Sequence, residues 1–213
     1  MTLYGVGLGP GDPELVTVRG KRLLERAETV FAPGELAEEL AGAYAPVERI
    51  ERLSFPMTRD EKALRTAWTE AAETVAPIAE DGIAAFATIG DPKVYSTFTH
   101  LKRALENFPE VVVETVPGVS VVTAFASALG VEIDGDPIEV REARVGVPGD
   151  AEQLLLLKVT DVPAIHRELT EAGYTATYGR RLFMTDSTVT TEPESLESGD
   201  YFTVAYATRE RSE

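Results

Sequence analysis

Groups able to bind a small molecule gather where one predicted strand ends. The apolar run 86–89 stops at Gly90-Asp91-Pro92, and Tyr95, Ser96 and Thr97 follow within a few residues. This order places a carboxylate, exposed main-chain groups, a phenol and two hydroxyls at the carboxyl end of a strand. Ligands of open α/β sheets bind at such strand ends. The segment 86–97 therefore predicts a ligand site.

A second glycine-rich turn, residues 5–13, follows the first predicted strand. It does not fit the GxGxxG spacing of dinucleotide-binding turns, because the third glycine would fall on Pro10 or on Asp12. Asp12 and Glu14 would also repel a pyrophosphate at a helix N-terminus. A P-loop is excluded because the sequence contains no GxxxxGK[ST] motif. The turn is either a structural connection or one wall of a cleft, and its spacing favours neither.

The segments around these turns alternate between strand and helix patterns, which predicts a mostly parallel sheet with helices on both faces. Thr17 is the expected N-cap of the first helix, and Thr58 with Glu61 forms a capping box at the start of another. Pro77 is expected to bend or end that second helix. Strands are predicted at residues 3–7, 29–32, 83–89 and 111–116, and helices at 17–27, 58–80 and 94–105.

The pattern changes after Val116, where strands become more frequent than helices. One helix is predicted after Gly118 and runs to Leu129, with Gly130 at the C-cap position. Another, capped by Asp161, is predicted from about residue 163 to residue 172 and is ended by Gly173. Strands are predicted at residues 139–147, 153–159, 176–184 and 201–207. The sequence therefore predicts an α/β fold of two α/β domains, residues 1–116 and 117–213, of which the second is richer in strands.

The chain is strongly acidic, with 36 Asp and Glu residues against 20 Lys and Arg and a net charge of −16. Nucleic acid binding needs a basic face, so this balance argues against a nucleic acid partner. The acidic residues are spread along the chain and arginine outnumbers lysine. This distribution favours a halophilic protein, because high salt screens the self-repulsion of such a surface. Ordinary acidic solubility is the alternative.

Cysteine is absent, which excludes disulfides, thiolate nucleophiles and zinc ribbons. His100 and His166 lie far apart and are expected to be ordinary helix residues, so no protein-bound metal is predicted; a site built from carboxylates alone is the alternative. No apolar run approaches the roughly 20 residues that a membrane span requires. The N-terminal residues 1–5 enter a strand without a signal-peptide pattern. We therefore expect a cytoplasmic protein with no membrane partner.

Three motifs together carry a resemblance that covers essentially the whole chain. The first is Tyr4-Gly5-Val6-Gly7-Leu8-Gly9-Pro10-Gly11-Asp12-Pro13, the second Gly90-Asp91-Pro92 and the third Val116-Pro117-Gly118-Val119-Ser120. In order and spacing they resemble the tetrapyrrole methylases, S-adenosylmethionine-dependent enzymes of the sirohaem and cobalamin pathways. Each motif alone is weak, whereas three in register are specific.

Within that family, residues 90–98 and 200–204 are similar to the C-20 methyltransferases that act on precorrin-2 or its cobalt chelate. Other corrin methylases tend to carry Tyr-Gly where this chain has Tyr95-Ser96. The chain departs from this subfamily in its acidity and in its short second half, whose loops are trimmed.

The resemblance implies two α/β domains with the cofactor, S-adenosylmethionine, in a cleft between them, a tetrapyrrole as the small-molecule substrate, and a homodimer. It also implies that main-chain groups hold the cofactor, which agrees with the close backbone approach that glycine permits. Motif matching assigns cofactor contacts to Pro10, Ile89, Gly90, Asp91, Val94, Ser96, Thr97, Ser120, Val121, Lys158, Val159, Met184 and Thr185.

The implied reaction is displacement at a sulfonium methyl by an electron-rich ring carbon, which needs alignment and exclusion of water. A base must then remove a proton from the methylated carbon. Asp91 is the first candidate for this base, and Tyr95 is a candidate orienting group. Each assignment has a structural alternative: an Asx-turn or helix cap for Asp91, an ordinary first helical turn for Ser96 and Thr97, and packing for Met184.

The implied substrate carries many carboxylates, as does the protein, so we expect arginines on the substrate side of the cleft, where bidentate geometry suits carboxylates. Solvated surface charge is the alternative for each of them. The candidates are Arg49, Arg52, Arg59 and Arg180.

Three functions remain open. The first is a C-20 methyltransferase acting on cobalt-factor II or precorrin-2. The second is another methylase of the superfamily, acting at another corrin position, on uroporphyrinogen III, or on a modified histidine of a translation factor, as diphthine synthase does. The third is a non-catalytic regulatory module that binds adenosyl ligands.

Overall fold

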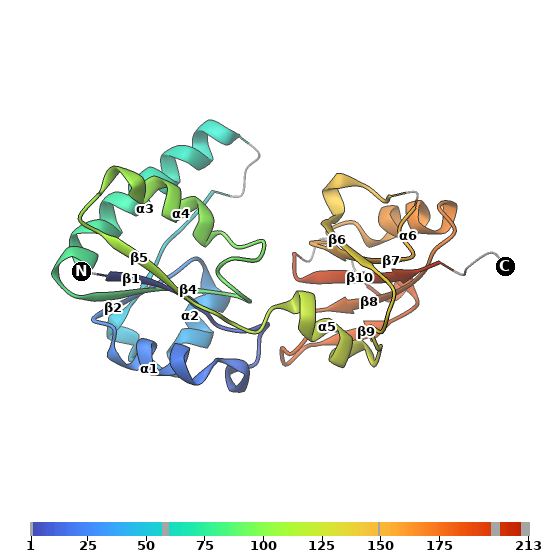
Figure 1. The fold of residues 1–213 in the computed structure, drawn as a ribbon, viewed down its shortest axis with the longest axis horizontal. Coiled ribbons are helices and arrows are strands. Elements are labelled where there is room, and N and C mark those ends of the chain that lie inside the picture. The colour runs from blue at the N-terminus through green and yellow to red at the C-terminus, as the bar shows by residue number, and fades with distance from the viewer. Residues whose placement is uncertain (1, 57–59, 149, 197–200, 210–213) are drawn as a thin grey trace. The chain divides into compact units, whose positions relative to one another are not determined.

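The computed structural model of the chain describes residues 2–56, 60–148, 150–196 and 201–209. It divides into two compact units, Met1–Ser120 and Val121–Glu213 (Figure 1). The boundary predicted between residues 116 and 117 lies just before this division, in the connection that follows the last strand of the first unit.

The first unit is built on one sheet of five parallel strands, as predicted from the alternating pattern. The strand order is β3-β2-β4-β1-β5, so β1 lies between β4 and β5. The strands are β1 (Thr2–Gly7), β2 (Thr29–Ala32), β3 (Ile50–Arg52), β4 (Ile83–Thr88) and β5 (Val112–Val116). The helices are α1 (Val18–Arg26), α2 (Glu35–Gly42), α3 (Glu61–Asp81) and α4 (Phe98–Ala104), with 3-10 turns at Pro13–Leu15, Val47–Arg49 and Leu105–Asn107.

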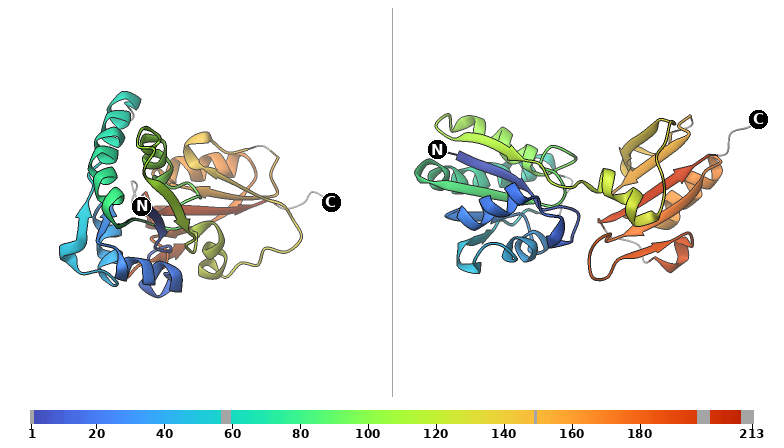
Figure 2. Two further views of the ribbon diagram at one scale, coloured as in Figure 1. Left: turned by 60° about the vertical axis from the view of Figure 1, so that its left-hand side comes forward. Right: turned by 60° about the horizontal axis from the view of Figure 1, so that its bottom comes forward.

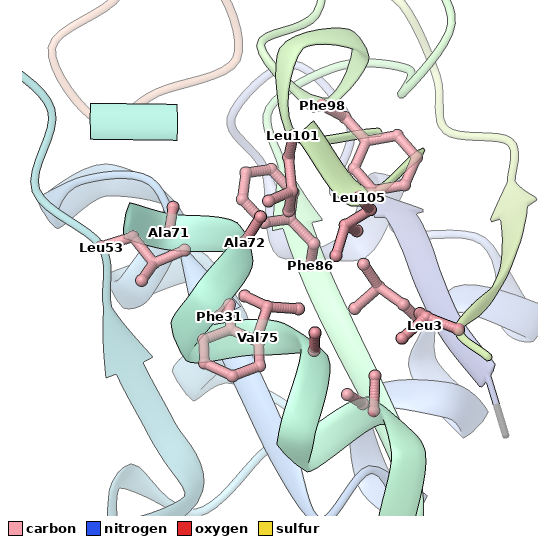
Figure 3. Close-up of a cluster of buried hydrophobic side chains, with 14 of the residues drawn as sticks. Leu3, Phe31, Leu53, Ala71, Ala72, Val75, Phe86, Phe98, Leu101 and Leu105 are labelled. Atoms are coloured by element: carbon pink, nitrogen blue, oxygen red, sulfur yellow. The ribbon is translucent and has the colours of Figure 1, made fainter. Parts of the chain in front are cut away.

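Helices cover both faces of this sheet because successive strand residues point to opposite sides. Leu3 and Phe86 pack with α3 and α4 on one face (Figure 3). Val6 and Ala87 pack with α1 and α2 on the other. Both faces are therefore buried, which is typical of a parallel sheet. The glycine-rich turns begin at the carboxyl ends of β1 and β4.

The second unit contains a mixed sheet in the order β6-β7-β10-β8-β9, in which only β6 and β7 are parallel. Leu154 and Leu156 face α6, whereas Leu155 and Leu157 face α5, so this sheet too is covered on both faces (Figure 2). The elements are α5 (Val121–Leu129), β6 (Ile138–Glu142), β7 (Gln153–Leu157), α6 (Val162–Glu171), β8 (Thr175–Arg180), β9 (Thr188–Thr190) and β10 (Thr203–Thr208), with 3-10 turns at Ala143–Val145 and Pro193–Ser195.

Several predicted boundaries in the first unit are wrong. The helix predicted from residue 94 begins at Phe98, because Tyr95 has a left-handed φ of 50° and the segment before Phe98 forms a turn. The N-cap of α3 is Asp60, whose carboxylate accepts from the N–H groups of Lys62 and Ala63, and the predicted cap Thr58 lies outside the described residues. Helix α3 also continues through Pro77 to Asp81, so the proline does not end it.

In the second unit three predicted strands end early. The strand predicted at residues 153–159 stops at Leu157. The strand predicted to reach residue 184 stops at Arg180, because Arg181 and Phe183 take left-handed φ values of 50° and 66°. The strand predicted to reach residue 147 stops at Glu142 and gives way to a 3-10 turn. Three elements were not predicted at all: α2, β3 and β9.

Candidate functional site

The first two motifs meet at the carboxyl edge of the first sheet. Because β1 and β4 are parallel neighbours, the turns that follow Gly7 and Thr88 leave the sheet side by side. The N–H of Leu8 donates to the carbonyl of Thr88 over 2.8 Å. Gly9 and Gly90 then exchange main-chain hydrogen bonds of 2.7 and 3.4 Å. The N-terminal glycine turn is thus hydrogen-bonded to the Gly90 turn.

The third motif joins them through contacts that leave no room for side chains. A β-carbon built on Gly7 would lie 2.5 Å from the carbonyl oxygen of Gly90 and 2.6 Å from Cα of Gly118. One built on Gly118 would meet the same oxygen and would lie 2.7 Å from Cα of Gly7. Real β-carbons essentially never approach other atoms this closely. The turns that follow β1, β4 and β5 thus meet here. We call residues 7–12, 89–97 and 117–120 the three-turn cluster.

Asp91 ties two of these turns together. Its Oδ1 accepts a hydrogen bond of 2.7 Å from the N–H of Lys93, which closes an Asx-turn. Its Oδ2 accepts a hydrogen bond of 3.1 Å from the N–H of Gly118. Asp91 therefore forms the Asx-turn that was the structural alternative for it. Its role as a base stays a prediction.

The hydroxyl of Ser96 is held inside the second turn. Its Oγ lies 3.0 Å from Oγ1 of Thr88 and accepts a hydrogen bond of 3.1 Å from the N–H of Phe98. The ring of Phe98 fills the space beside Gly5, where a β-carbon would lie 2.6 Å from Cζ of the ring. Because Phe98 is buried against β1, the start of α4 and the Ser96 turn are fixed relative to the sheet (Figure 3).

The loop between Asp91 and Ser96 is more open. Tyr95 is 46% exposed and Val94 is 37% exposed. Thr97 occupies the N-cap position of α4 without a side-chain capping bond. Eight of the predicted cofactor residues thus lie in the three turns at one edge of the first sheet: Pro10, Ile89, Gly90, Asp91, Val94, Ser96, Thr97 and Ser120.

The remaining predicted cofactor residues belong to the second unit, where Val121 begins α5. Lys158 and Val159 follow β7, and Met184 and Thr185 lie in the turn after β8. Because β7 and β8 both pair with β10 in antiparallel fashion, their carboxyl ends lie at the same edge of the second sheet. Contact between these residues and a cofactor stays a prediction.

Lys158 has a left-handed backbone conformation, and its ammonium is paired with a carboxylate. Its φ is 58°, and its ammonium lies 2.6 Å from Oε1 of Glu142 and 5.1 Å from the centre of the Tyr201 ring. Burial lowers the pKa of Lys158, but hydrogen bonds to Glu142 and Tyr201 outweigh burial and raise the pKa above its ordinary value. Burial raises the pKa of Glu142, but Lys158 and Arg144 outweigh it, so this carboxyl has a lowered pKa.

The predicted substrate arginines that the structure describes do not lie together in one site. Arg49 precedes β3 and donates to the carbonyls of Glu25 and Ala27 at the end of α1, on the amino side of the sheet. Arg52 ends β3 on the carboxyl side and pairs with Glu38. Strand β3 lies two strands from β4, about 10 Å away. Arg180 ends β8 in the second unit, and Arg59 lies outside the described residues.

Sequence reasoning missed two features of the site. The close approach of Gly7 to Gly118 had a signal, because each glycine stands at or just after the end of a predicted strand. The Glu142–Lys158 pair had none, because only the pairing of β6 with β7 brings the two residues together. Within the described parts of the chain no group of three or more His, Asp or Glu side chains is placed to hold a metal ion, and no helix is long and apolar enough to cross a membrane.

Residues 2–195 match the sequence model of the family described as Tetrapyrrole (Corrin/Porphyrin) Methylases. A Methanocaldococcus jannaschii protein named probable cobalt-precorrin-2 C(20)-methyltransferase is 38% identical over 141 residues, which cover 63% of this chain and 60% of that protein. A Sinorhizobium precorrin-2 C(20)-methyltransferase is 32% identical over 231 residues, covering 95% of this chain and 93% of that protein. The chain thus spans less than two thirds of the first of these relatives.

Among solved structures, the fold is similar to that of uroporphyrin-III C-methyl transferase from Thermus thermophilus complexed with S-adenyl homocysteine. The TM-score is 0.69 at 20% identity, and the alignment covers 98% of this chain and 97% of that chain. At this identity the likeness concerns the fold alone. The resemblance noted in the three motifs is confirmed at the level of the family.

Proposed function

The chain belongs to the tetrapyrrole (corrin/porphyrin) methylases, and on that basis we propose that it is an S-adenosylmethionine-dependent C-methyltransferase that methylates C-20 of cobalt-factor II or precorrin-2 in cobalamin biosynthesis. The observation that carries the proposal is the three-turn cluster, which unites all three family motifs at the carboxyl edge of a parallel sheet. The C(20) names of the two relatives support the ring position.

The residues of the three-turn cluster fit an adenosyl ligand. Glycines at the contact points keep β-carbons away from the turns, so main-chain N–H and carbonyl groups can approach a ligand closely. In our proposal the cofactor is held by the turns that contain Pro10, Gly90, Val94 and Ser120. S-adenosylmethionine, when bound, supplies an activated methyl group. A structural neighbour crystallised with S-adenyl homocysteine supports the same ligand class here.

The work left to the protein is to bind the ring, to orient it and to accept a proton. Tyr95, exposed beside the cluster, is the proposed orienting group. Of the arginines, Arg52 and Arg180 stand at the carboxyl ends of strands and are the better placed to meet substrate carboxylates. Arg52 must then exchange its ion pair with Glu38 for one with the substrate. Arg49, on the amino side of the first sheet, is not part of this proposal.

The test is methyl transfer from S-adenosylmethionine carrying a ¹³C methyl group, in high salt, to cobalt-factor II, precorrin-2 and uroporphyrinogen III in parallel. We expect the label on C-20 of one of the first two, located by NMR of the product. Transfer only to uroporphyrinogen III, or to another ring carbon, overturns the assigned position. Tight binding of S-adenosylhomocysteine without transfer to any tetrapyrrole would favour the regulatory module, and absence of binding would refute both.

A further inference from the structure

The two carboxylate oxygens of Asp91 accept hydrogen bonds from two different turns. Oδ1 bonds to the N–H of Lys93, two residues along the chain, and so shapes the local turn. Oδ2 bonds to the N–H of Gly118, twenty-seven residues along the chain and in another turn. The bond to Lys93, two residues on, is the ordinary bond of an Asx-turn. One carboxylate therefore couples a local turn to a distant one.

The distant bond lies where the backbones of the three turns touch. Gly118 approaches the carbonyl of Gly90 and Cα of Gly7 so closely that no side chain fits. Close packing alone resists compression but does not keep the turns from separating. The bond from Gly118 to Oδ2 supplies that restraint, and a bond to an ionised acceptor is about twice as strong as one between neutral groups.

We propose that Asp91 is a positioning residue that fixes the Gly118 turn against the Gly90 turn and so shapes the adenosyl-binding surface. The inference rests on the proposed function for its ligand, but the restraint itself is a property of the first unit. A general base must offer an oxygen to the substrate proton while the reaction proceeds. Both oxygens of Asp91 already hold main-chain donors of the three-turn cluster, and protonation of either would weaken one of these bonds.

Two substitutions separate positioning from base catalysis. Asp91→Asn keeps a carbonyl for the Lys93 N–H, since asparagine also forms Asx-turns, but turns an amide NH₂ toward Gly118. Asp91→Ala loses both bonds. We expect the affinity for S-adenosylhomocysteine, measured by calorimetry, to fall about tenfold in the Asn variant and further in the Ala variant. The kcat at saturating cofactor should stay within about threefold of wild type and keep its pH profile.

The opposite pattern overturns the proposal. If Asp91 is the base, both variants lose kcat by about a hundredfold or more, keep their cofactor affinity and lose one limb of the pH profile. Asp161→Asn is the matched control, because Asp161 also accepts from a main-chain N–H, that of Ala164, but only within its own helix cap. We expect wild-type cofactor affinity and kcat for this control, and a tenfold loss there would refute the argument.

Hydrogen exchange tests the restraint without a ligand, first in the wild-type chain and then in Asp91→Asn. The Gly118 amide of the wild-type chain should be protected although it lies in a turn outside helix and strand, and a freely exchanging amide overturns the proposal. In folded Asp91→Asn, checked by circular dichroism, this amide should exchange about ten times faster or more. If the amide is protected but S-adenosylhomocysteine does not bind, the proposed function fails while the restraint stands.

Discussion

A methyl group added at Gly7 would have to occupy space held by the backbones of two other turns. In Gly7→Ala the new carbon starts 2.5 Å from the Gly90 carbonyl oxygen and 2.6 Å from N and Cα of Gly118, whereas ordinary contact begins at 3.4 Å. At least one turn must move by about 1 Å, and none of the obstructing atoms is the end of a flexible side chain. The clash can therefore be relieved only by a shift of the backbone, because no side chain can turn away from the new methyl group.

Overpacking of this kind costs about 1–3 kcal/mol, and we expect the upper end because Gly9 and Gly90 are also held by paired hydrogen bonds. For a unit of this size, about 3 kcal/mol lowers the midpoint of thermal unfolding by about 10 °C. Differential scanning calorimetry measures this shift, and calorimetric titration with S-adenosylhomocysteine measures the accompanying loss of affinity.

Gly42→Ala is the matched control. Gly42 is the last residue of α2, and a β-carbon there would meet only Cδ1 of Ile50, at 3.9 Å. Alanine is the better helix former by about 1 kcal/mol, so we expect an unchanged or slightly raised midpoint and unchanged affinity. If Gly7→Ala behaves like Gly42→Ala in both measurements, the three turns are not in the contact described, and the reasoning fails.

Three further outcomes follow from the charges of the chain. Burial raises the pKa of Tyr178 from 10.0 to about 12, so the folded chain holds this proton more tightly than the unfolded chain and loses stability as the pH rises above 10.0. In Tyr178→Phe the midpoint of thermal unfolding should fall less steeply with pH above 10.0. Equal slopes of midpoint against pH in the two proteins would contradict this. The pKa of Glu142 is lowered below 4.5, so this carboxylate stabilises the fold above pH 4.5 and the stabilisation is lost as the pH falls below that value. In Glu142→Gln the free energy of unfolding, measured in urea, should decrease less on acidification. The same decrease as in the wild type would count against the ion pair with Lys158. With a net charge of −16, raising KCl from about 0.1 M to about 2 M should raise the midpoint of thermal unfolding, whereas a fall would argue against salt adaptation.

The parts of the fold that depend on local pattern were predictable from the sequence. Strand β2 was placed at its observed residues, and α1 within a residue at each end, because an apolar run and the Thr17 cap mark them. Helix α2 follows Gly34, which has no side chain to cap the helix, so its start had no capping signal. Strands β3 and β9 have three residues each, which is too short to show an alternating pattern. Short elements form here because a longer neighbouring strand pairs with them.

The site was predictable only as a location. The rule that ligands bind at the carboxyl ends of parallel strands brought the turns after β1 and β4 to one edge. It could not show that Oδ2 of Asp91 bonds to Gly118, because this bond depends on the order β4-β1-β5, which the sequence does not state. Nor could it show that Tyr95 takes a left-handed φ of 50°, which is uncommon for a residue with a side chain.

The same strand order explains why three motifs, each weak alone, are specific together. Strand β1 lies between β4 and β5, so its turn touches both others, and the contacts that join one turn to another all involve main chain. A side chain at Gly7 or Gly118 would have to displace the backbone of another turn. A surface of main chain can serve a cofactor that many enzymes share but cannot distinguish their substrates. We therefore expect the choice of ring position to depend on exposed side chains beside the cluster, of which Tyr95 is the most prominent.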